Sequence, residues 1–292
     1  MRNWFDDFRY ALRQLRKNPG FAAVAVLTLA LGLGANSAIF SVIDAVLLRP
    51  LPFHAPSRLV VVKPTAPGRR DDIGVSYPTF LDWRAQNHVF EGMSVFREGD
   101  FTLTGRGEPA HLTGAVVSAN LFSLLGVPPG IGRDFIPDED KPSGTGLPVI
   151  LSHNLWQSRF GSDPKVVGQN LTLDGQSFAV VGVMPAGFQF PVQRTAVDLS
   201  TTIALDAQPM GSSPPMTSQR GVAYLDAIAR LRPQVARSTA QTEMAGIQDG
   251  LNRQYPENRP KGINLVPESD AVVGDMRQGL FILLGAVGLV LL

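Results

Sequence analysis

Cysteine is absent from this chain of 292 residues, which excludes disulfides, zinc–thiolate sites and a cysteine nucleophile. Histidine is scarce, and His54, His88, His111 and His153 lack the spacing of metal ligands. The motifs G-x-S-x-G and H-E-x-x-H, which mark serine hydrolases and zinc peptidases, do not occur. We therefore expect no catalytic residue, no metal and no cofactor, so the chain is not expected to be an enzyme.

Two local patterns resemble ligand sites but lack part of their chemistry. Residues 138–140 read Asp-Glu-Asp, without the spacing or the glycine of an EF-hand. The pair Gly32-x-Gly34 lies inside a long apolar segment rather than after a strand, so it is no dinucleotide fingerprint. A solvated acidic loop and an apolar helix are the simpler interpretations.

A broad excess of one charge is also lacking. Residues 50–278 carry 20 basic and 22 acidic side chains, which argues against a nucleic-acid partner. The first 20 residues differ, because they hold five basic side chains against two acidic ones. Residues 18–43 hold no charge at all.

That uncharged segment predicts a transmembrane helix over residues 18–48. Residues 21–43 alone would reach about 34 Å as a helix, against about 30 Å for a bilayer core. A cleaved signal peptide is the alternative, although the apolar stretch is long for one and lacks a clear small-x-small exit. The basic flank predicts a cytoplasmic N-terminus and export of residues 49–275.

Residues 1–17 predict an amphipathic helix that lies along the cytoplasmic surface. It is either a passive topological anchor or a surface that couples to a cytoplasmic partner. The candidate coupling residues are Arg9, Arg13, Arg16 and Lys17. Small and polar residues within the span predict close packing against other helices. The candidate packing residues are Ala30, Gly34, Ala38 and Asn36.

A second apolar run covers residues 279–292. It would reach only about 21 Å as a helix, which is typical of a buried core helix. The alternative is the start of a second transmembrane helix, truncated, over residues 276–292.

The segment between the two apolar runs predicts a mixed α and β domain. Expected strands cover residues 58–63, 92–97, 101–105, 110–117, 221–231 and 262–269. Expected helices cover residues 76–86 and 152–160, with Ser76 and Ser152 as N-caps. Loops are expected over residues 134–148 and 206–219.

The sequence QNLTLDGQSFAVVGV predicts a β-hairpin with a two-residue turn at Asp174-Gly175. This turn places Leu173 opposite Gln176 and Leu171 opposite Phe178. The expected buried face consists of Leu171, Leu173, Phe178 and Val180.

A longer helix is predicted from residue 238 to Tyr255-Pro256. Ser238 and Gln241 have the spacing of a capping box at its start. Its expected apolar face consists of Ala240, Met244, Ile247 and Leu251.

Several blocks resemble permease subunits of the MacB/FtsX superfamily of ABC transporters. They are FRYALRQLRKNPGFAAVAVLTLALGLGANSAIFSVIDAVLLRPLPF at 8–53, VILSHNLWQSRFGSDPKVVGQNLTLDGQSFAVVGVMPAGFQFP at 149–191, AYLDAIARLRP at 223–233 and NRQYPENR at 252–259. The resemblance implies an α+β periplasmic domain, flanked by transmembrane α-helices. That domain would be a porter-like βαβ subdomain with an inserted β-rich subdomain at about 118–218. The resemblance further implies that residues 276–292 are the start of the second of these transmembrane helices, truncated, rather than a core helix.

The resemblance also implies a function and partners. The chain would be the N-terminal part of a bacterial inner-membrane permease that couples ATP hydrolysis to periplasmic movement, for efflux, for lipid or lipoprotein extraction, or for envelope regulation. No G-x-x-x-x-G-K-[ST] motif occurs, so a separate ATPase subunit is expected. Further expected partners are a second permease copy, membrane lipids and a periplasmic adaptor or outer-membrane component.

Two other functions are compatible with the layout. One is a periplasmic sensor domain with an output module after the second apolar run. The other is a membrane-anchored envelope hydrolase, which the missing nucleophile and metal motifs disfavour.

Overall fold

A computed structural model of the chain describes residues 13, 16–43, 53–66, 73–105, 107–141, 146–191, 196–209, 211–257 and 262–273. The chain divides into two units. The larger unit comprises residues 51–272, and the other comprises residues 1–50 together with 273–292.

Helix α2, Pro19–Ile43, belongs to the smaller unit. It has a proline at its first position and covers nearly all of the uncharged segment. Across the residues that the structure describes, no helix is both long and apolar enough to cross a membrane. Apart from Arg13, Arg16 and Lys17, the predicted cytoplasmic helix lies outside the described residues, as does the predicted second span.

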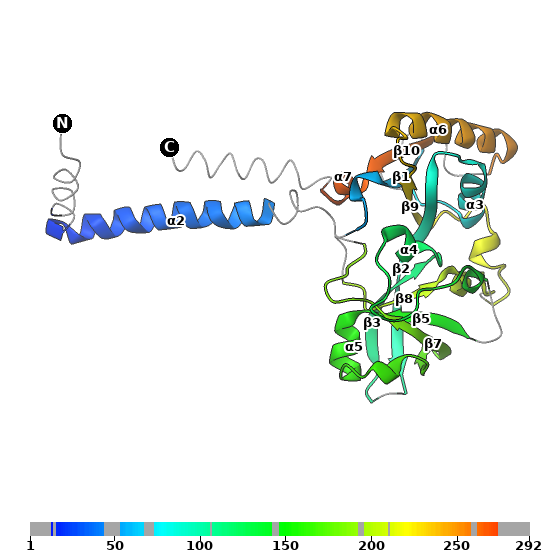
Figure 1. Cartoon of the computed structure of the whole chain (residues 1–292), viewed down its shortest axis with the longest axis horizontal. Helices are drawn as coiled ribbons and strands as arrows, with labels where there is room; N and C mark the ends of the chain where they lie inside the picture. Colours follow the sequence, from blue (N-terminus) through cyan, green and yellow to red (C-terminus); the bar gives the residue numbers. More distant parts are fainter. Residues whose placement is uncertain are drawn as a thin grey trace. The chain divides into compact units, whose positions relative to one another are not determined.

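Four antiparallel strands in the order β10–β1–β9–β2 form one half of the larger unit. Helix α3 connects β1 to β2 and helix α6 connects β9 to β10, so the β-α-β pattern occurs twice in a ferredoxin-like order (Figure 1). These elements are β1 (Leu59–Thr65), α3 (Tyr77–Gln86), β2 (Phe90–Thr104), β9 (Asp226–Leu231), α6 (Arg237–Gln254) and β10 (Gly262–Pro267).

The other half is a closed β-barrel in the order β2–β3–β8–β5–β7–β6, with β6 pairing back to β2. Its further strands are β3 (Ala110–Val117), β5 (Leu147–Leu151), β6 (Asn170–Leu173), β7 (Gln176–Val183) and β8 (Leu199–Thr202). The short strand β4 (Ile131–Gly132) pairs with β7. Closure leaves no free edge in the ring and fills its interior with apolar side chains.

Shorter helical elements connect these strands. They are η2 (Pro56–Arg58), α4 (Leu121–Leu125), η3 (Pro137–Asp140), α5 (His153–Phe160), η4 (Pro164–Val166), η5 (Ile203–Ala207), η6 (Met216–Ser218) and α7 (Glu268–Val273).

Strand β2 belongs to both halves. Residues 90–96 pair with β9, residues 96–103 pair with β3, and residues 103–104 pair with β6. The chain therefore leaves the four-stranded half along β2 and returns through β9. The range 118–218, inferred for the insert, lies inside this excursion.

The prediction of separate strands at 92–97 and 101–105 is wrong, because β2 is continuous. Gly99, which falls between the two expected strands, lies directly opposite Gly114 on β3. A Cβ at Gly114 would lie 2.3 Å from Cε2 of Phe101, so the ring of Phe101 occupies the space above this glycine. The Phe101 ring thus covers the backbone of the two paired glycines, which have no side chains. The pairing of β2 with β3 therefore continues through Gly99.

The hairpin prediction is confirmed. Leu171 lies opposite Phe178 and Leu173 lies opposite Gln176. The four expected core residues are all buried, with exposed fractions of 0–2%. Gly175 has φ of 77° and Asp174 has φ of 48°, as a two-residue hairpin turn of this type requires.

Both serine N-caps are also confirmed. The Ser76 hydroxyl accepts from the Thr79 N–H, and the Ser152 hydroxyl accepts from the Leu155 N–H. The capping box predicted at Ser238 is wrong, because α6 begins at Arg237 with Ala236 at its N-cap. The Gln241 side chain bonds to β10 instead.

The apolar side chains form two clusters. The larger lies beneath α3 and α6 and extends through the barrel interior, where the rings of Phe101 and Phe178 meet edge to face at 6.2 Å. It includes Ala240, Met244 and Leu251 of the predicted α6 stripe, with Ile247 partly buried beside them. The smaller cluster contains Phe53, the first described residue of the larger unit, together with Leu59, Phe122 and Phe190.

Candidate functional site: the junctions of the domain

The polar groups that could suggest chemistry have protein partners. Asp138 pairs with Lys141, Glu139 pairs with Arg133, and Asp140 accepts the Ala119 N–H at 2.8 Å. Burial raises the pKa of Asp140 to about 6. Among the described residues, no three histidine, aspartate or glutamate side chains group as a metal site.

Each of the four histidines has different neighbours, and they do not come together in one site. His88 is 3.9 Å from Glu243, and His111 is 3.3 Å from Asp100. The ring of His153 packs edge-on against Trp156 at 5.3 Å. His54 lies where the chain joins the larger unit.

The residues predicted for coupling and packing belong to the smaller unit. Arg13, Arg16, Lys17, Ala30 and Gly34 are exposed, and the space around a Cβ at Gly34 is open to 4 Å. Arg9 and the side chains of Asn36 and Ala38 lie outside the described parts. The roles proposed for these residues stay predictions.

The inbound junction, residues 53–58, is where the chain joins the larger unit. Phe53 is 6% exposed and packs against Phe188 and Phe190, with ring centroids 6.4 and 6.2 Å away. Phe190 in turn meets Phe96 on β2 at 4.8 Å. Aromatic contacts therefore connect the inbound chain, through Phe190, to the strand that both halves share.

A close approach of backbones fixes His54 against the end of α4. The His54 N–H donates to the Leu125 carbonyl at 3.0 Å. Gly126 caps α4 in the left-handed conformation, with φ of 73°. A Cβ at Gly126 would lie 2.4 Å from the His54 Cβ, so only glycine fits between the two segments.

Arg230 on β9 donates hydrogen bonds to the inbound junction. It is 5% exposed, and its guanidinium donates to the carbonyls of Leu124, His54 and Ala55. The Nε–O distance to Leu124 is 3.0 Å and the Nη1–O distance to Ala55 is 3.1 Å. One side chain thus connects a central strand, the end of α4 and the inbound chain. Burial lowers the pKa of Arg230, and the charge of Arg58 lowers it further.

A second arginine, Arg58, attaches the inbound junction to β9 and β2. Its Nε donates to the Leu231 carbonyl at 2.8 Å, and its Nη2 pairs with Glu91 at the start of β2. The junction is therefore bonded to β9 and β2 before β1 begins.

The outbound junction runs from β10 into α7, which Figure 1 shows beside β1. Val60 on β1 lies opposite Pro267 on β10, so the chain joins and leaves the larger unit at the same end of the sheet. Glu268, the first residue of α7, is 5% exposed. Burial raises its pKa to about 7; the charge of Asp226 adds to the shift, and that of Lys63 opposes it.

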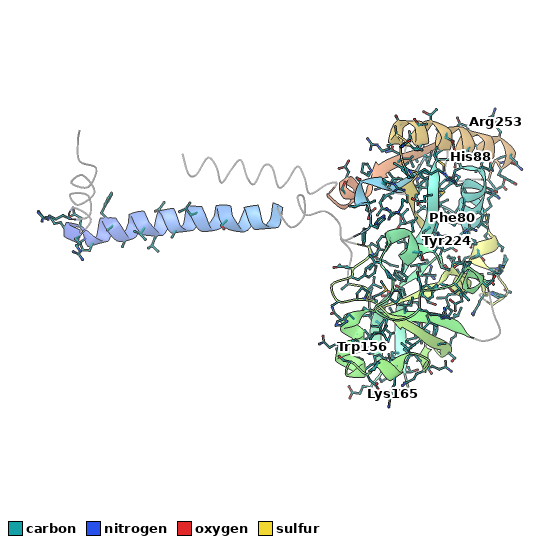
Figure 2. All side chains as sticks on the ribbon, in the orientation of Figure 1. Phe80, His88, Trp156, Lys165, Tyr224 and Arg253 are labelled. Carbon is teal, nitrogen blue, oxygen red and sulfur yellow. The ribbon has the colours of Figure 1, made fainter. Side chains whose placement is uncertain are left out.

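Two arginines hold the chain that returns from the barrel to β9. Arg97 on β2 donates from Nε and Nη2 to the two carboxylate oxygens of Asp206 in η5, with an Nε–Oδ2 distance of 2.8 Å. Arg220, on the chain returning to β9, donates to Asp82 of α3 at 2.7 Å and lies 3.8 Å above the Tyr255 ring. In Figure 2, Tyr224 lies between the barrel end, with Trp156 and Lys165, and the α6 end, with His88 and Arg253.

Sequence reasoning missed the residues that build both junctions. The sequence did give a sign of Arg230, because this charged residue interrupts the apolar strand AIARL. It lies on the same face of the strand as Ile228. Glu268 had a weaker signal, directly after a strand that ends in proline. Nothing in the sequence indicated that Gly126 must be glycine, because the residue that leaves no room for a Cβ, His54, is about 70 residues away in the chain.

Comparisons with known proteins give the same fold. The family described as MacB-like periplasmic core domain matches residues 22–247. The periplasmic region of MacB from Actinobacillus actinomycetemcomitans aligns with a TM-score of 0.55 and 10% identity, over 76% of this chain and 94% of that one. A search of curated proteins found no match.

Two further solved structures are similar. The extracellular domain of the noncanonic ABC-type transporter YknZ from Gram-positive bacteria has a TM-score of 0.51 and 11% identity, over 71% of this chain and 99% of that one. A domain of a permease-like protein from Porphyromonas gingivalis has a TM-score of 0.53 and 17% identity, over 74% and 92%. The family match covers most of the sequence, and the chain belongs to the MacB-like periplasmic core domain family.

Proposed function

We propose that this chain is the N-terminal part of a permease subunit of a bacterial ABC transporter. In this proposal the uncharged segment and its flank, residues 18–48, anchor the chain in the membrane. Residues 49–275 lie outside the cytoplasm, and a separate ATPase supplies the energy. The domain performs no chemistry. It receives movement from the membrane segments and changes its contacts with a substrate or an envelope partner.

The observation that carries this proposal is the pair of neighbouring junctions. The chain joins and leaves the larger unit at one end of the sheet, through paired strands. Aromatic rings, close backbone contact and the Arg230 hydrogen bonds attach the inbound junction to the core. A displacement of the inbound chain would therefore move β9, β2 and α4 together rather than bend a loop.

The absence of cysteine provides a test of the membrane arrangement. Single cysteines can replace the exposed Lys165 and Arg16 in the full chain. In spheroplasts, a membrane-impermeant maleimide should label the variant K165C at once and label R16C only after lysis. Labelling of both variants before lysis, or of R16C alone, would contradict the proposed orientation.

ATP coupling needs a separate test. The complete gene product, purified from its own membranes in mild detergent, should carry an associated ATPase activity. Replacing Arg230 with Met should change that activity, whereas the neighbouring, exposed Arg232→Met should not. A purified, folded protein with no ATPase activity would favour the sensor alternative.

A further inference from the structure

The outer edge of strand β10 has an unusual cover. β10 ends the order of the described strands, so β1 is its single strand neighbour among them. In antiparallel pairing, alternate residues of an edge strand turn both backbone groups away from the neighbour. Such outward groups can accept a further strand unless something blocks them.

Gln241 occupies these outward groups. Its Nε2 donates to the Ile263 carbonyl at 2.8 Å, and its Oε1 accepts from the Leu265 N–H at 2.8 Å. In an antiparallel pairing centred on Asn264, an added strand would bond to this carbonyl and this N–H through the two residues that flank the one opposite Asn264. The amide therefore occupies the two backbone groups that such a strand would need. Farther along, Pro267 has no N–H to offer.

The opposite edge of the four-stranded half is protected more heavily. There the chain itself continues past β3, and the Ser118 N–H donates to the Val95 carbonyl at 2.9 Å. The Ser118 hydroxyl accepts from the Val95 N–H at 3.0 Å, and the Asn120 amide donates to the Met93 carbonyl at 2.8 Å. Among the described residues, main chain and two side chains cover the β2 edge, whereas the Gln241 amide alone covers the β10 edge.

We propose that Gln241 keeps β10 closed against strand addition by β10 of a second copy of this chain. Asn264 is exposed between the buried Ile263 and Leu265, so it marks the centre of the outward pair. Two copies could pair antiparallel about a two-fold axis at this residue, each offering the same carbonyl and N–H. The inference stands independently of the proposed transport function.

The test compares Gln241→Leu with a matched control, Gln254→Leu. Gln254 lies in the last turn of the same helix and its amide bonds to the Tyr255 hydroxyl instead of a strand. Each change is placed in the full chain, in detergent micelles, with Asn264→Cys as the sole cysteine. The measurements are amide exchange at Leu265 and oxidative crosslinking between copies, since Cα atoms of directly paired residues lie within disulfide range.

In the Gln241→Leu background we expect exchange at Leu265 to accelerate at least about tenfold, and a disulfide-linked dimer to form through N264C. In the Gln254→Leu background and with N264C alone, residue 264 should not crosslink and Leu265 should stay protected from exchange. Fast exchange without a dimer would overturn the proposal, as would equal crosslinking in all three backgrounds. If Gln241→Leu fails to fold, Gln241→Glu replaces it; it retains an acceptor for Leu265 but loses the donor to Ile263, and the same comparison decides.

Discussion

The inbound and outbound junctions lie side by side but are held by different forces. The inbound junction combines aromatic packing, a glycine-only contact and a guanidinium that donates to three carbonyl groups. The outbound junction begins with a buried carboxyl group, Glu268, whose pKa is raised to about 7. The Arg230 guanidinium of the inbound junction stays charged near neutral pH, whereas the Glu268 carboxyl of the outbound junction gains or loses its charge there.

This difference assigns the two junctions different roles. Buried, close-packed contacts that do not change with pH transmit a displacement of one segment to its neighbours, because none of these segments can move without the others. A buried carboxyl that is half ionised near neutrality costs free energy when charged, so its surroundings are easier to open. We therefore expect the inbound junction to behave as a rigid connection and the outbound one as an adjustable connection.

The largest effect is expected for Gly126→Ala. A Cβ there would collide with the His54 Cβ, and alanine would also adopt φ of 73°, so we expect a loss of about 4 kcal/mol in unfolding free energy. Urea denaturation monitored by tryptophan fluorescence measures it. Gly161→Ala is the control, because Gly161 also ends a helix at positive φ but has open space around a Cβ. Equal losses in both variants would mean that the His54 contact contributes nothing.

The next effect is expected for Arg230→Met. Methionine fills similar space but leaves the carbonyls of Leu124, His54 and Ala55 without their donor, which should cost about 3 kcal/mol. Arg232→Met, two residues along and exposed, should cost less than about 0.5 kcal/mol. Similar stabilities for the two variants would show that the buried guanidinium does not hold the junction.

A smaller effect, with a defined pH dependence, is expected for Glu268→Gln. Because the folded-state pKa is raised from 4.5 to about 7, the folded state holds the proton more tightly than the unfolded state. Stability from this group is therefore present below about pH 4.5 and is lost as pH rises to about 7. The substitution should raise stability by about 2 kcal/mol at pH 8 and change it little at pH 4.5.

Thermal unfolding of wild type and Glu268→Gln across this pH range provides the measurement. The exposed Glu257→Gln serves as control and should leave the wild-type pH dependence unchanged. A pH slope that persists in Glu268→Gln would assign the titration to another group.

The local features of the fold were predictable from sequence where neighbours in the chain determine them. The Asp174-Gly175 hairpin, both serine caps and the α6 stripe depend on residues a few positions apart, and all are present. The continuity of β2 was not predictable, because it depends on Phe101 covering Gly114 across a strand pair. Tertiary pairing overrides the low strand preference of Gly99.

The candidate site shows the same limit more strongly. Gln241 has the spacing of a capping box, yet its amide bonds to β10, more than 20 residues away. Arg230 and Gly126 act on His54 and Ala55, far from them in the chain. The junctions are built from long-range contacts, which periodicity and turn signals do not encode.

The most direct test of a rigid inbound junction is amide exchange at His54 in the full chain. Its N–H donates to the Leu125 carbonyl, and it lies beside Arg230 and Gly126. If the junction moves with the core, His54 should exchange as slowly as amides of β9, and Arg230→Met should accelerate it selectively. Exchange of the wild-type His54 amide at the rate of an exposed loop would contradict a rigid connection.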